Sequence, residues 1–404
     1  MTDRRVRLAT VVAAALYLAC VAAPNSMASD ARPGLQAVAP NAPSPQCGDT
    51  ITTSVQLRTD LTCPGDGLIV GADNIVINLD GHTIRGSDGT GSIGIADGVR
   101  GPSHSNVTIR NGTIGGYFYI GVSLHGSQAV NLVDLQVLSI RYGGGMYICL
   151  ELADTTGVTV RGGYLVNNWG LGVIDASGDD LLISETTLSG AHPTPIAGRV
   201  SLSGGATIKG SSLRQVVVSW TGRLVVADSE LSISSIEPAA PVGENSYSAK
   251  LTGNTFSGSP GCITCDASDH DTSIVAILGE RGMEIAGVEI RGNRFDGARA
   301  AGVFIQAPES TVTGVVISGN TFSNNGFGGY PYTRPAQDAI GSLVNDGLHI
   351  TVPPGTDITV ADNHTSDNAD YGIEAVPGTV IDGGGNVSSN DPSGCLGVTC
   401  TYVT

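Results

Sequence analysis

Apolar and polar positions along the chain repeat in a short pattern. Two apolar residues are separated by four small or polar ones, as in Ile109–Ile114 (IRNGTI), Leu251–Phe256 (LTGNTF) and Ile317–Phe322 (ISGNTF). The pattern returns about a dozen times, mostly at intervals of about 18 to 30 residues, which suits one coil of a β-solenoid and is short for a helical-pair repeat. Most copies precede a second apolar run, such as Ala301–Ala307. Each coil is therefore expected to hold two or more strands.

Aligning the copies predicts which side chains share a face. Strands of adjacent coils lie about 4.8 Å apart and their side chains alternate between the two faces. One inward column is predicted to hold Leu79, Ile109, Leu132, Val160, Ile183, Ile208, Val226, Leu251, Ile290, Ile317, Val360 and Ile381. A second is predicted to hold Ile84, Ile114, Val137, Leu165, Leu188, Leu213, Leu231, Phe256, Phe295 and Phe322.

One polar position also recurs between the two columns. Asn254, Asn293, Asn320 and Asn363 occupy the same place in successive copies. Side-chain amides carry both donors and acceptors, so stacked asparagines can bond along the column. We expect a structural asparagine ladder at a bend of the coil, in preference to a catalytic or metal-binding role.

Composition supports an all-β protein. The chain has 57 Gly, 19 Pro and only 14% charged residues, and its Val, Ile and Thr alternate with polar positions. Such segments lack both helix-forming residues and the 3.6-residue apolar stripe. We expect a single-domain parallel solenoid of about 11–12 coils, because a continuous repeat outweighs the two domains that the length would otherwise suggest.

The N-terminus is predicted to direct export. Three arginines precede an apolar run over residues 8–23, and Ser26-Met27-Ala28 is a small-residue cleavage site, so residues 1–28 read as a signal peptide. The Pro/Ala-rich residues 29–46 are expected to be a flexible spacer, followed by the solenoid over residues 47–404. Removing residues 1–28 moves the formal charge from −17 to −19. This acidity disfavours a nucleic-acid partner, and no segment predicts membrane insertion of the mature, extracellular protein.

Export also changes the interpretation of the cysteines, because an oxidising compartment favours disulfides. We expect Cys47 and Cys63 to join in an N-terminal cap, Cys395 and Cys400 in the C-terminal tail, and Cys262 and Cys265 in a protruding loop. Cys149 is left unpaired on a strand. A redox role for the Cys262–Cys265 segment is disfavoured because no βαβ pattern surrounds it.

The register, the GNTF, GNRF and GNTF copies and the segment Asn74–Gly86 (NIVINLDGHTIRG) resemble the right-handed parallel β-helix proteins of the pectin-lyase-like superfamily. The resemblance covers about four-fifths of the chain. It implies a right-handed coil and a carbohydrate site along an outer sheet. It implies no particular reaction, because that architecture carries lyases, hydrolases, epimerases, tailspikes and adhesins.

The catalytic patterns of these enzymes are mostly absent. Neither the pectate lyase segments nor the DPHE segment of mannuronan epimerases is present. Only Ser177-Gly178-Asp179-Asp180 is similar to the GDD segment of polygalacturonase-like hydrolases. Asp179 and Asp180 stand where other copies place a turn, so turn chemistry explains them in preference to a hydrolase carboxylate role.

A basic cluster is the feature that the repeat leaves unexplained. Lys209, Lys250, Glu289, Arg291 and Arg294 are predicted to face outward within a few adjacent coils. Lyases acting on uronic acid polymers need a base for the C5 proton and a positive group for the carboxylate. We therefore hypothesise a polysaccharide lyase with Lys250, Arg291, Glu289 and Lys209 as catalytic residues. The alternative interpretation is solvated surface charge paired across strands.

Two insertions flank this cluster, and insertions in solenoids often build binding walls. The insertion 324–347 is predicted to supply substrate contacts, together with Arg294. Residues 257–273 offer a weaker Ca²⁺ site, against the alternative of a solvated acidic loop; no other cofactor is expected. The predicted substrate contacts are Arg294, Phe327, Tyr330, Tyr332, Arg334 and Asp338. The predicted Ca²⁺ ligands are Asp266, Asp269 and Asp271.

His125 and Glu151 are predicted to lie at equivalent positions of neighbouring strands, where they could act as an acid/base pair or form an ordinary surface contact. Three function classes remain: a secreted lyase acting on an extracellular polysaccharide, a non-catalytic glycan-binding or adhesion protein, and, more weakly, a glycoside hydrolase.

Overall fold

A computed structural model describes residues 43–87, 92–99, 101–139, 148–167, 172–190, 198–238, 246–258, 273–279, 281–327, 338 and 341–403. All of them belong to one compact unit, Gly34–Thr404. Their regular structure is β-strand throughout, and every registered strand pair is parallel. The predicted signal peptide and most of the spacer lie outside the described residues. No helix in the described ranges is long and apolar enough to cross a bilayer.

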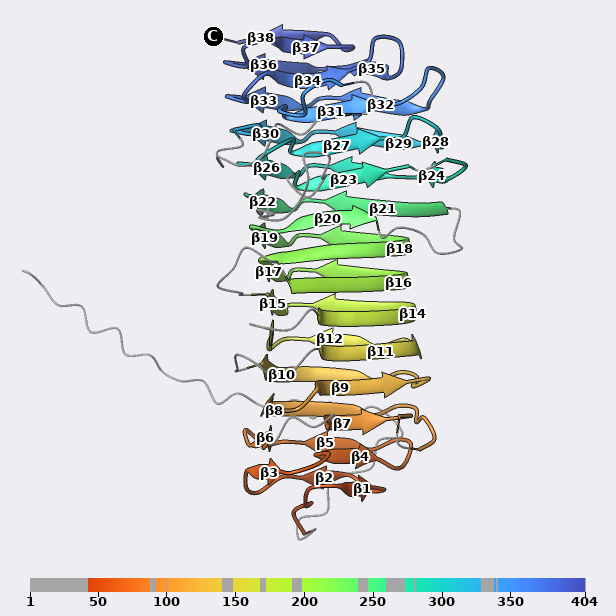
Figure 1. The fold of residues 1–404 in the computed structure, drawn as a ribbon, viewed down its shortest axis with the longest axis vertical. Coiled ribbons are helices and arrows are strands. Elements are labelled where there is room, and N and C mark those ends of the chain that lie inside the picture. The colour runs from red at the N-terminus through yellow and green to blue at the C-terminus, as the bar shows by residue number, and fades with distance from the viewer. Residues whose placement is uncertain are drawn as a thin grey trace, which may run out of the picture. The chain divides into compact units, whose positions relative to one another are not determined.

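The strand pairings form three parallel ladders along the stack of coils, called here the first, second and third sheets, and long strands such as β14 belong to two of them. Figure 1 shows the stacked strands. The first sheet contains β2 (Val55–Gln56), β5 (Val76–Asn78), the starts of β8 (Thr108–Gly116) and β10 (Asn131–Ser139), β12 (Thr159–Arg161), the ends of β14 (Gly172–Ser184), β16 (Gly198–Lys209) and β18 (Val216–Ala227), β21 (Ser246–Thr252), β25 (Glu289–Arg291), β29 (Val315–Ser318), β32 (Ile358–Ala361) and β35 (Ile381–Gly384).

The second sheet follows the first after a bend. It contains β3 (Leu61–Cys63), β6 (Thr83–Gly86), the ends of β8 and β10, β13 (Tyr164–Asn167), β15 (Thr187–Ser189), β17 (Ser212–Arg214), β19 (Glu230–Ser232), β22 (Thr255–Ser257), β26 (Arg294–Asp296), β30 (Thr321–Ser323), β33 (His364–Ser366), β36 (Asn386–Ser389) and β38 (Cys400–Tyr402).

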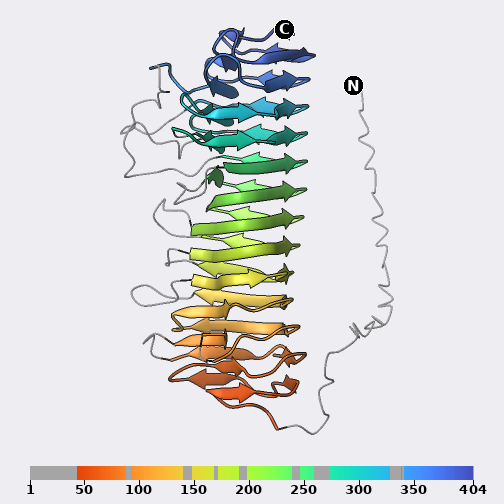
Figure 2. The same cartoon turned by 90° about the vertical axis from the view of Figure 1, so that its right-hand side faces the viewer.

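The third sheet closes each coil. It contains β1 (Asp49–Ile51), β4 (Leu68–Val70), β7 (Ile93–Asp97), β9 (Ile120–His125), β11 (Ile148–Thr156), the starts of β14, β16 and β18, β20 (Ser235–Pro238), β23 (Val275–Leu278), β27 (Val303–Gln306), β31 (Leu348–Thr351), β34 (Tyr371–Ala375) and β37 (Gly394–Leu396). Two short strands, β24 (Glu284–Ala286) and β28 (Thr311–Thr313), add a further segment in two later coils. The expected all-β parallel solenoid is confirmed, and Figure 2 shows its coils from the side.

The core consists of apolar columns between the sheets. The predicted second column is in register throughout, and Phe256, Phe295 and Phe322 stack in it with ring centroids 4.8 and 5.0 Å apart. These rings are fully buried. Offset or parallel stacking of this kind adds to the gain from burying apolar area, so the phenylalanines strengthen the later coils.

The predicted first column is wrong at its two ends. Ile77, and not Leu79, pairs with Ile109, because the turn after β5 contains two extra residues before Ile84. Ile381 is 49% exposed, because β35 is shifted by one residue against β32. The remaining members of the first column, from Ile109 to Val360, pair in register as the alignment predicts.

The predicted asparagine ladder is present and is longer than expected. Asn320 accepts bonds on Oδ1 from the backbone N and Nδ2 of Asn293, at 2.9 and 3.1 Å, and donates from Nδ2 to Ile290 O. The same bonds continue from Asn320 to Asn363 and from Asn363 to Asn386. The Asn320 amide thus pairs with buried backbone groups at the bend of the neighbouring coil, accepting from Asn293 N and donating to Ile290 O.

A second ladder, which the sequence alignment did not reveal, lies one bend further on. Asn325 Nδ2 donates to Asn368 Oδ1, and Asn368 Nδ2 donates to Asp391 Oδ1. Asp391 Oδ2 also accepts from Thr365 and Ser388. A carboxylate is an acceptor on both oxygens, so Asp391 can end a chain of donors without leaving one unpaired.

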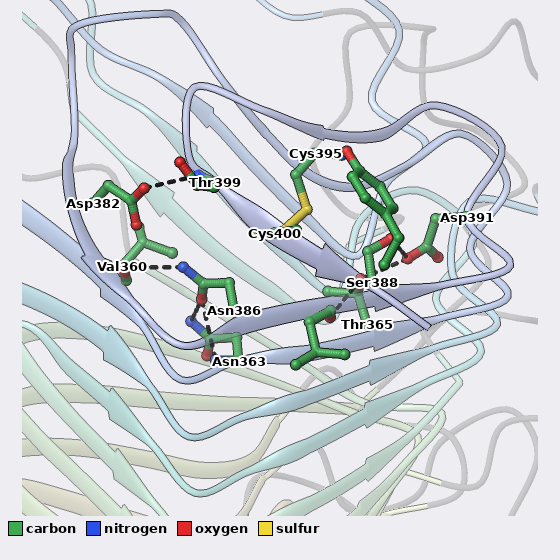
Figure 3. Close-up of a disulfide and its surroundings, with 12 residues drawn as sticks. Val360, Asn363, Thr365, Asp382, Asn386, Ser388, Asp391, Cys395, Thr399 and Cys400 are labelled. Atoms are coloured by element: carbon green, nitrogen blue, oxygen red, sulfur yellow. Dashed lines mark hydrogen bonds between the residues drawn. A yellow bond between two sulfur atoms is a disulfide. The ribbon is translucent and has the colours of Figure 1, made fainter. Parts of the chain in front are cut away.

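Both ends of the solenoid carry the expected disulfides. Cys47, just before β1, is joined to Cys63 on β3 in the cap, and Cys395 and Cys400 join β37 to β38. At the C-terminal end, Thr399 N also donates to Asp382 Oδ2 at 2.8 Å (Figure 3). Together these links hold the last described coil in place.

We expect Asn320→Ala to lower the free energy of unfolding by about 2–4 kcal/mol, because the substitution leaves the buried donors of Asn293 without an acceptor. The change is measured by denaturant unfolding, with the exposed Thr313→Ala as the control. An Asn320→Ala protein as stable as this control would contradict the structural role of the ladder.

Thiol counting tests the disulfide assignment. Cys149 is fully buried, and burial raises the pKa of its thiol, so the folded mature protein should not react with a thiol reagent. Unfolded without reductant, it should show one free thiol. The Cys262–Cys265 pair lies outside the described residues and stays a prediction; two additional reactive thiols would show that it is reduced.

Candidate functional site

The predicted basic cluster consists of side chains on two neighbouring strands of the first sheet. Lys250 on β21 pairs in register with Glu289 on β25, and Lys250 Nζ lies 3.2 Å from Glu289 Oε2. Arg291 Nε lies 3.4 Å from the same oxygen, and Arg291 also donates to Ser318 Oγ. The hydrogen bond from Lys250 and the charges of both cations lower the pKa of Glu289. The carboxylate therefore neutralises part of the cluster's positive charge.

The other two basic residues do not join this group. Lys209 shares its outward column with Arg291, but Ala227 and Thr252 stand between them, which makes about 14 Å at about 4.8 Å a coil. Arg294 lies beyond the bend on β26 and contacts Asp296 at 3.4 Å. The structure thus brings together three of the predicted residues.

The two insertions enter the stack at another edge. Each connects a second-sheet strand to a third-sheet strand, β22 to β23 and β30 to β31, whereas Lys250 lies on the first sheet. Phe327 is exposed, and Asp338 is buried in contact with His349. The other predicted residues of the insertions lie outside the described ranges: Tyr330, Tyr332, Arg334, Asp266, Asp269, Asp271, Cys262 and Cys265.

The outer face of the third sheet carries a different polar column. Its members occupy the same register position on β9, β11, β14, β16, β18 and β20. They are hydroxyl and carboxyl side chains, of which Ser123 and Ser219 are buried while the carboxyl groups and Ser201 reach the surface. The column holds Ser123, Glu151, Asp175, Ser201, Ser219 and Glu237.

The predicted His125–Glu151 contact is present with a different register. Glu151 lies beside Ser123, and His125 lies beside Ala153, so the contact is diagonal. His125 Nε2 is 3.0 Å from Glu151 Oε2, and Ser123 Oγ donates to the same oxygen. The side chains of His125 and Glu151 are 39% and 27% exposed, so both reach the surface of the sheet.

Asp175 is the neighbour of Glu151 on the next coil. Partial burial and the negative charge of Glu151 raise the pKa of Asp175, while Arg199 opposes the shift. The two carboxyl groups therefore differ in their surroundings: Glu151 contacts Ser123 and His125, whereas the pKa of Asp175 is raised. Two neighbouring carboxyl groups in different environments are the arrangement that acid/base hydrolysis uses.

Sequence reasoning missed Asp175, although a signal was available. Glu151 follows Leu150 and Asp175 follows Ile174, and these two apolar residues pair in register. Aligning the second apolar run of each coil as carefully as the first would have placed the two acids side by side. The acids Asp179 and Asp180, which are similar to a hydrolase segment, lie further along β14, after its register shift against β11, and both are exposed. Asp180 has a left-handed φ of 58°, which is typical of a turn-like bend in the backbone.

A second group of ionisable side chains is buried near the C-terminal end of the third sheet. His349 on β31 contacts Asp338 and Asp346 from the insertion and Glu374 from β34. Burial alone would lower the pKa of His349, but its hydrogen bonds to Asp346 and Glu374 raise it to about 10. Burial raises the pKa of Asp346 to about 6, although the His349 contact opposes this.

This group is also the candidate cation site within the described ranges. One ligand-type atom from each of Asp346, His349 and Glu374 lies within 4.8 Å of the others. The sequence analysis did not single out His349. The available signal was a histidine in the strand Leu348–Thr351, between residues that the repeat places in the core.

The chain is a right-handed parallel β-helix. A family model described as "Right handed beta helix region" matches residues 242–399. No curated protein matches the chain.

Two solved structures show a distant likeness. A Dettilon tailspike protein (gp208) is 12% identical with a TM-score of 0.41, over 81% of this chain and 60% of the tailspike chain. The A-module of the Azotobacter vinelandii mannuronan C-5 epimerase AlgE6 is 11% identical with a TM-score of 0.38, over 88% of this chain and 85% of that chain. These values are too low to assign an activity to this chain.

Proposed function

We propose that the protein is a secreted glycoside hydrolase that binds an extended polysaccharide along the third sheet. The observation that carries this proposal is the placement of Asp175 directly beside Glu151 on adjacent coils of an outward-facing column. Asp175 is the general acid that protonates the leaving glycosidic oxygen. Glu151, held by Ser123 and His125, is the ionised carboxylate that attacks the sugar or activates water.

The charge of the column selects the substrate class. Glu151, Asp175 and Glu237 lie along the path of the polymer, and the mature chain has a formal charge of −19 once residues 1–28 are removed. A polyanionic glycan would be repelled along this face. The proposed substrate is therefore an uncharged polysaccharide, oriented in part by the half-buried hydroxyl group of Ser201.

Export is part of this proposal. The N-terminal arginines and apolar run are typical of a signal peptide, and the disulfides at both ends suit an oxidising compartment.

The cluster of Lys250, Glu289 and Arg291 supports a second candidate function. Its two cations could act on a uronic acid polymer by β-elimination, with Ca²⁺ assisting in neutralising the substrate carboxylate. We rank it second because Glu289 lies between the two cations and contacts both.

Product analysis separates these functions. The mature protein is incubated with panels of neutral and uronic acid polysaccharides, with and without EDTA. New reducing ends without ultraviolet absorbance support the hydrolase, whereas an unsaturated, absorbing product that EDTA suppresses supports the Ca²⁺-assisted lyase. Binding without any product would support the glycan-binding or adhesion alternative.

Asp175→Asn and Glu151→Gln should each lower the turnover of the neutral substrate by about 10²–10⁴-fold, because each removes a proton donor or acceptor in the transition state. Asp180→Asn is the matched control, since it makes the same change at an exposed turn and should keep wild-type turnover. Equal turnover in Asp175→Asn and Asp180→Asn would rule out Asp175 as the acid.

The pH profile provides an independent test. Asp175 acts in its protonated form, so activity should fall as pH rises through its pKa. Arg199 lowers that pKa, so Arg199→Gln should raise it and move the alkaline limb of kcat to higher pH. Arg223→Gln is the control, because it changes an exposed arginine on the neighbouring strand β18. It should leave the alkaline limb of kcat at the wild-type pH. A shift to lower pH in Arg199→Gln would contradict the assignment.

A further inference from the structure

The buried group around His349 is arranged so that three atoms converge on one point. Asp346 Oδ2 lies 2.7 Å and Glu374 Oε2 lies 3.1 Å from the same ring atom, His349 Nδ1. The three residues come from the insertion before β31, from β31 and from β34, so the convergence arises only when consecutive coils stack. The side chains of Asp346 and His349 are almost fully buried. The Glu374 side chain is 15% exposed, so the group can be reached from solvent at Glu374.

Both carboxylates are held through their other oxygen. Asp346 Oδ1 accepts a hydrogen bond from Tyr371 N at 2.9 Å, and Glu374 Oε1 accepts one from Ser342 Oγ at 3.0 Å. Each acid therefore directs one carboxylate oxygen toward His349 Nδ1, while a hydrogen bond from the protein fixes its second oxygen. Preoriented ligands of this kind are the feature that distinguishes a built metal site from an incidental group of acids.

The opposite side of the imidazole is also fixed. His349 Nε2 faces Asp338 Oδ2 at 3.3 Å, and Asp338 is itself held by Thr351 Oγ1 at 2.6 Å and by Ser342 N at 2.7 Å. A carboxylate that accepts the Nε2 proton leaves Nδ1 as the atom available to a metal, which is the usual carboxylate–histidine–metal arrangement.

The chemistry of the group suits a cation. Two carboxylate oxygens and one imidazole nitrogen lie within 4.8 Å of one another, and all three are atom types that bind metal ions. Buried charges in proteins are normally paired with an opposite charge or bound to a metal.

We propose that His349 Nδ1, Asp346 Oδ2 and Glu374 Oε2 bind a divalent transition-metal ion of the zinc class, with Asp338 orienting the imidazole. One nitrogen and two oxygen ligands suit Zn²⁺, whereas Ca²⁺ prefers oxygen ligands only. The ion would tie the insertion before β31 to two consecutive coils. The site lies about 29 Å along the stack from Asp175, at about 4.8 Å a coil, so this proposal is independent of the proposed hydrolase.

The test is Zn²⁺ binding to the EDTA-treated, dialysed mature protein, measured by calorimetry and by elemental analysis. The expected result is one Zn²⁺ per chain, a higher melting temperature on Zn²⁺ addition, and little displacement by excess Ca²⁺. Because Zn²⁺ has to replace the proton on Nδ1, the binding heat should also change with the ionisation enthalpy of the buffer.

Variants connect the binding to these residues. Glu374→Gln removes a ligand charge and should weaken Zn²⁺ binding by more than about 10-fold, and Asp338→Asn should weaken it by about 10–100-fold through the imidazole. Glu309→Gln, which changes an exposed glutamate paired with Arg281, is the matched control and should bind as the wild type does. Circular dichroism of each variant confirms that it is folded.

Two results would overturn the proposal. One is a folded wild-type protein that takes up no Zn²⁺ at neutral pH, which would leave the group as a proton-linked ion cluster. The other is Zn²⁺ binding that is equally tight in the wild type, Glu374→Gln and Asp338→Asn, which would place the ion elsewhere on the chain.

Discussion

Backbone hydrogen bonding between consecutive coils is the interaction on which the rest of the structure depends. Every registered strand pair in the described ranges is parallel, so each coil offers its next neighbour a complete row of donors and acceptors. A slip of one residue would turn the apolar columns outward, because side chains alternate along a strand. The register is therefore the quantity that the sequence has to specify, and the stacked phenylalanines and asparagines specify it in the later coils.

The bends of the coil pose a separate problem, since they bury backbone groups that no strand can pair. Asparagine solves it in the later coils. Thr186, Ser211 and Ser229 occupy the same position in the earlier ones, where the hydroxyls of Ser211 and Ser229 each accept a hydrogen bond from the backbone N of the preceding coil. The second ladder ends on a carboxylate at Asp391, near the disulfide of Cys395 and Cys400. The last coil is thus closed by acceptors and a covalent link where the repeat itself stops.

Function on such a scaffold depends on outward residues, because inward positions are committed to packing. The same coil spacing that stacks phenylalanine rings also brings Glu151 within reach of Asp175 and aligns hydroxyl groups above and below them. A surface of this kind suits a polymer better than a small molecule, since its polar side chains follow one another along the stack. The buried group at His349 differs from it, because its residues come partly from an insertion and are withdrawn from solvent.

Local pattern was sufficient to predict the parallel solenoid, the column from Ile84 to Phe322 and the ladder from Asn254 to Asn363, because each of these follows from residues at equal places in neighbouring copies. The two terminal disulfides were predictable from the cysteines near each end and the expected oxidising compartment. The contact of Lys250, Glu289 and Arg291 was predictable for the same reason. Only the tertiary structure decided the diagonal contact of His125 with Glu151, the burial of Asp338 and the convergence of Asp346 and Glu374 on His349. Those contacts depend on how turns and insertions of unequal length carry the chain between sheets, and that path has no period in the sequence.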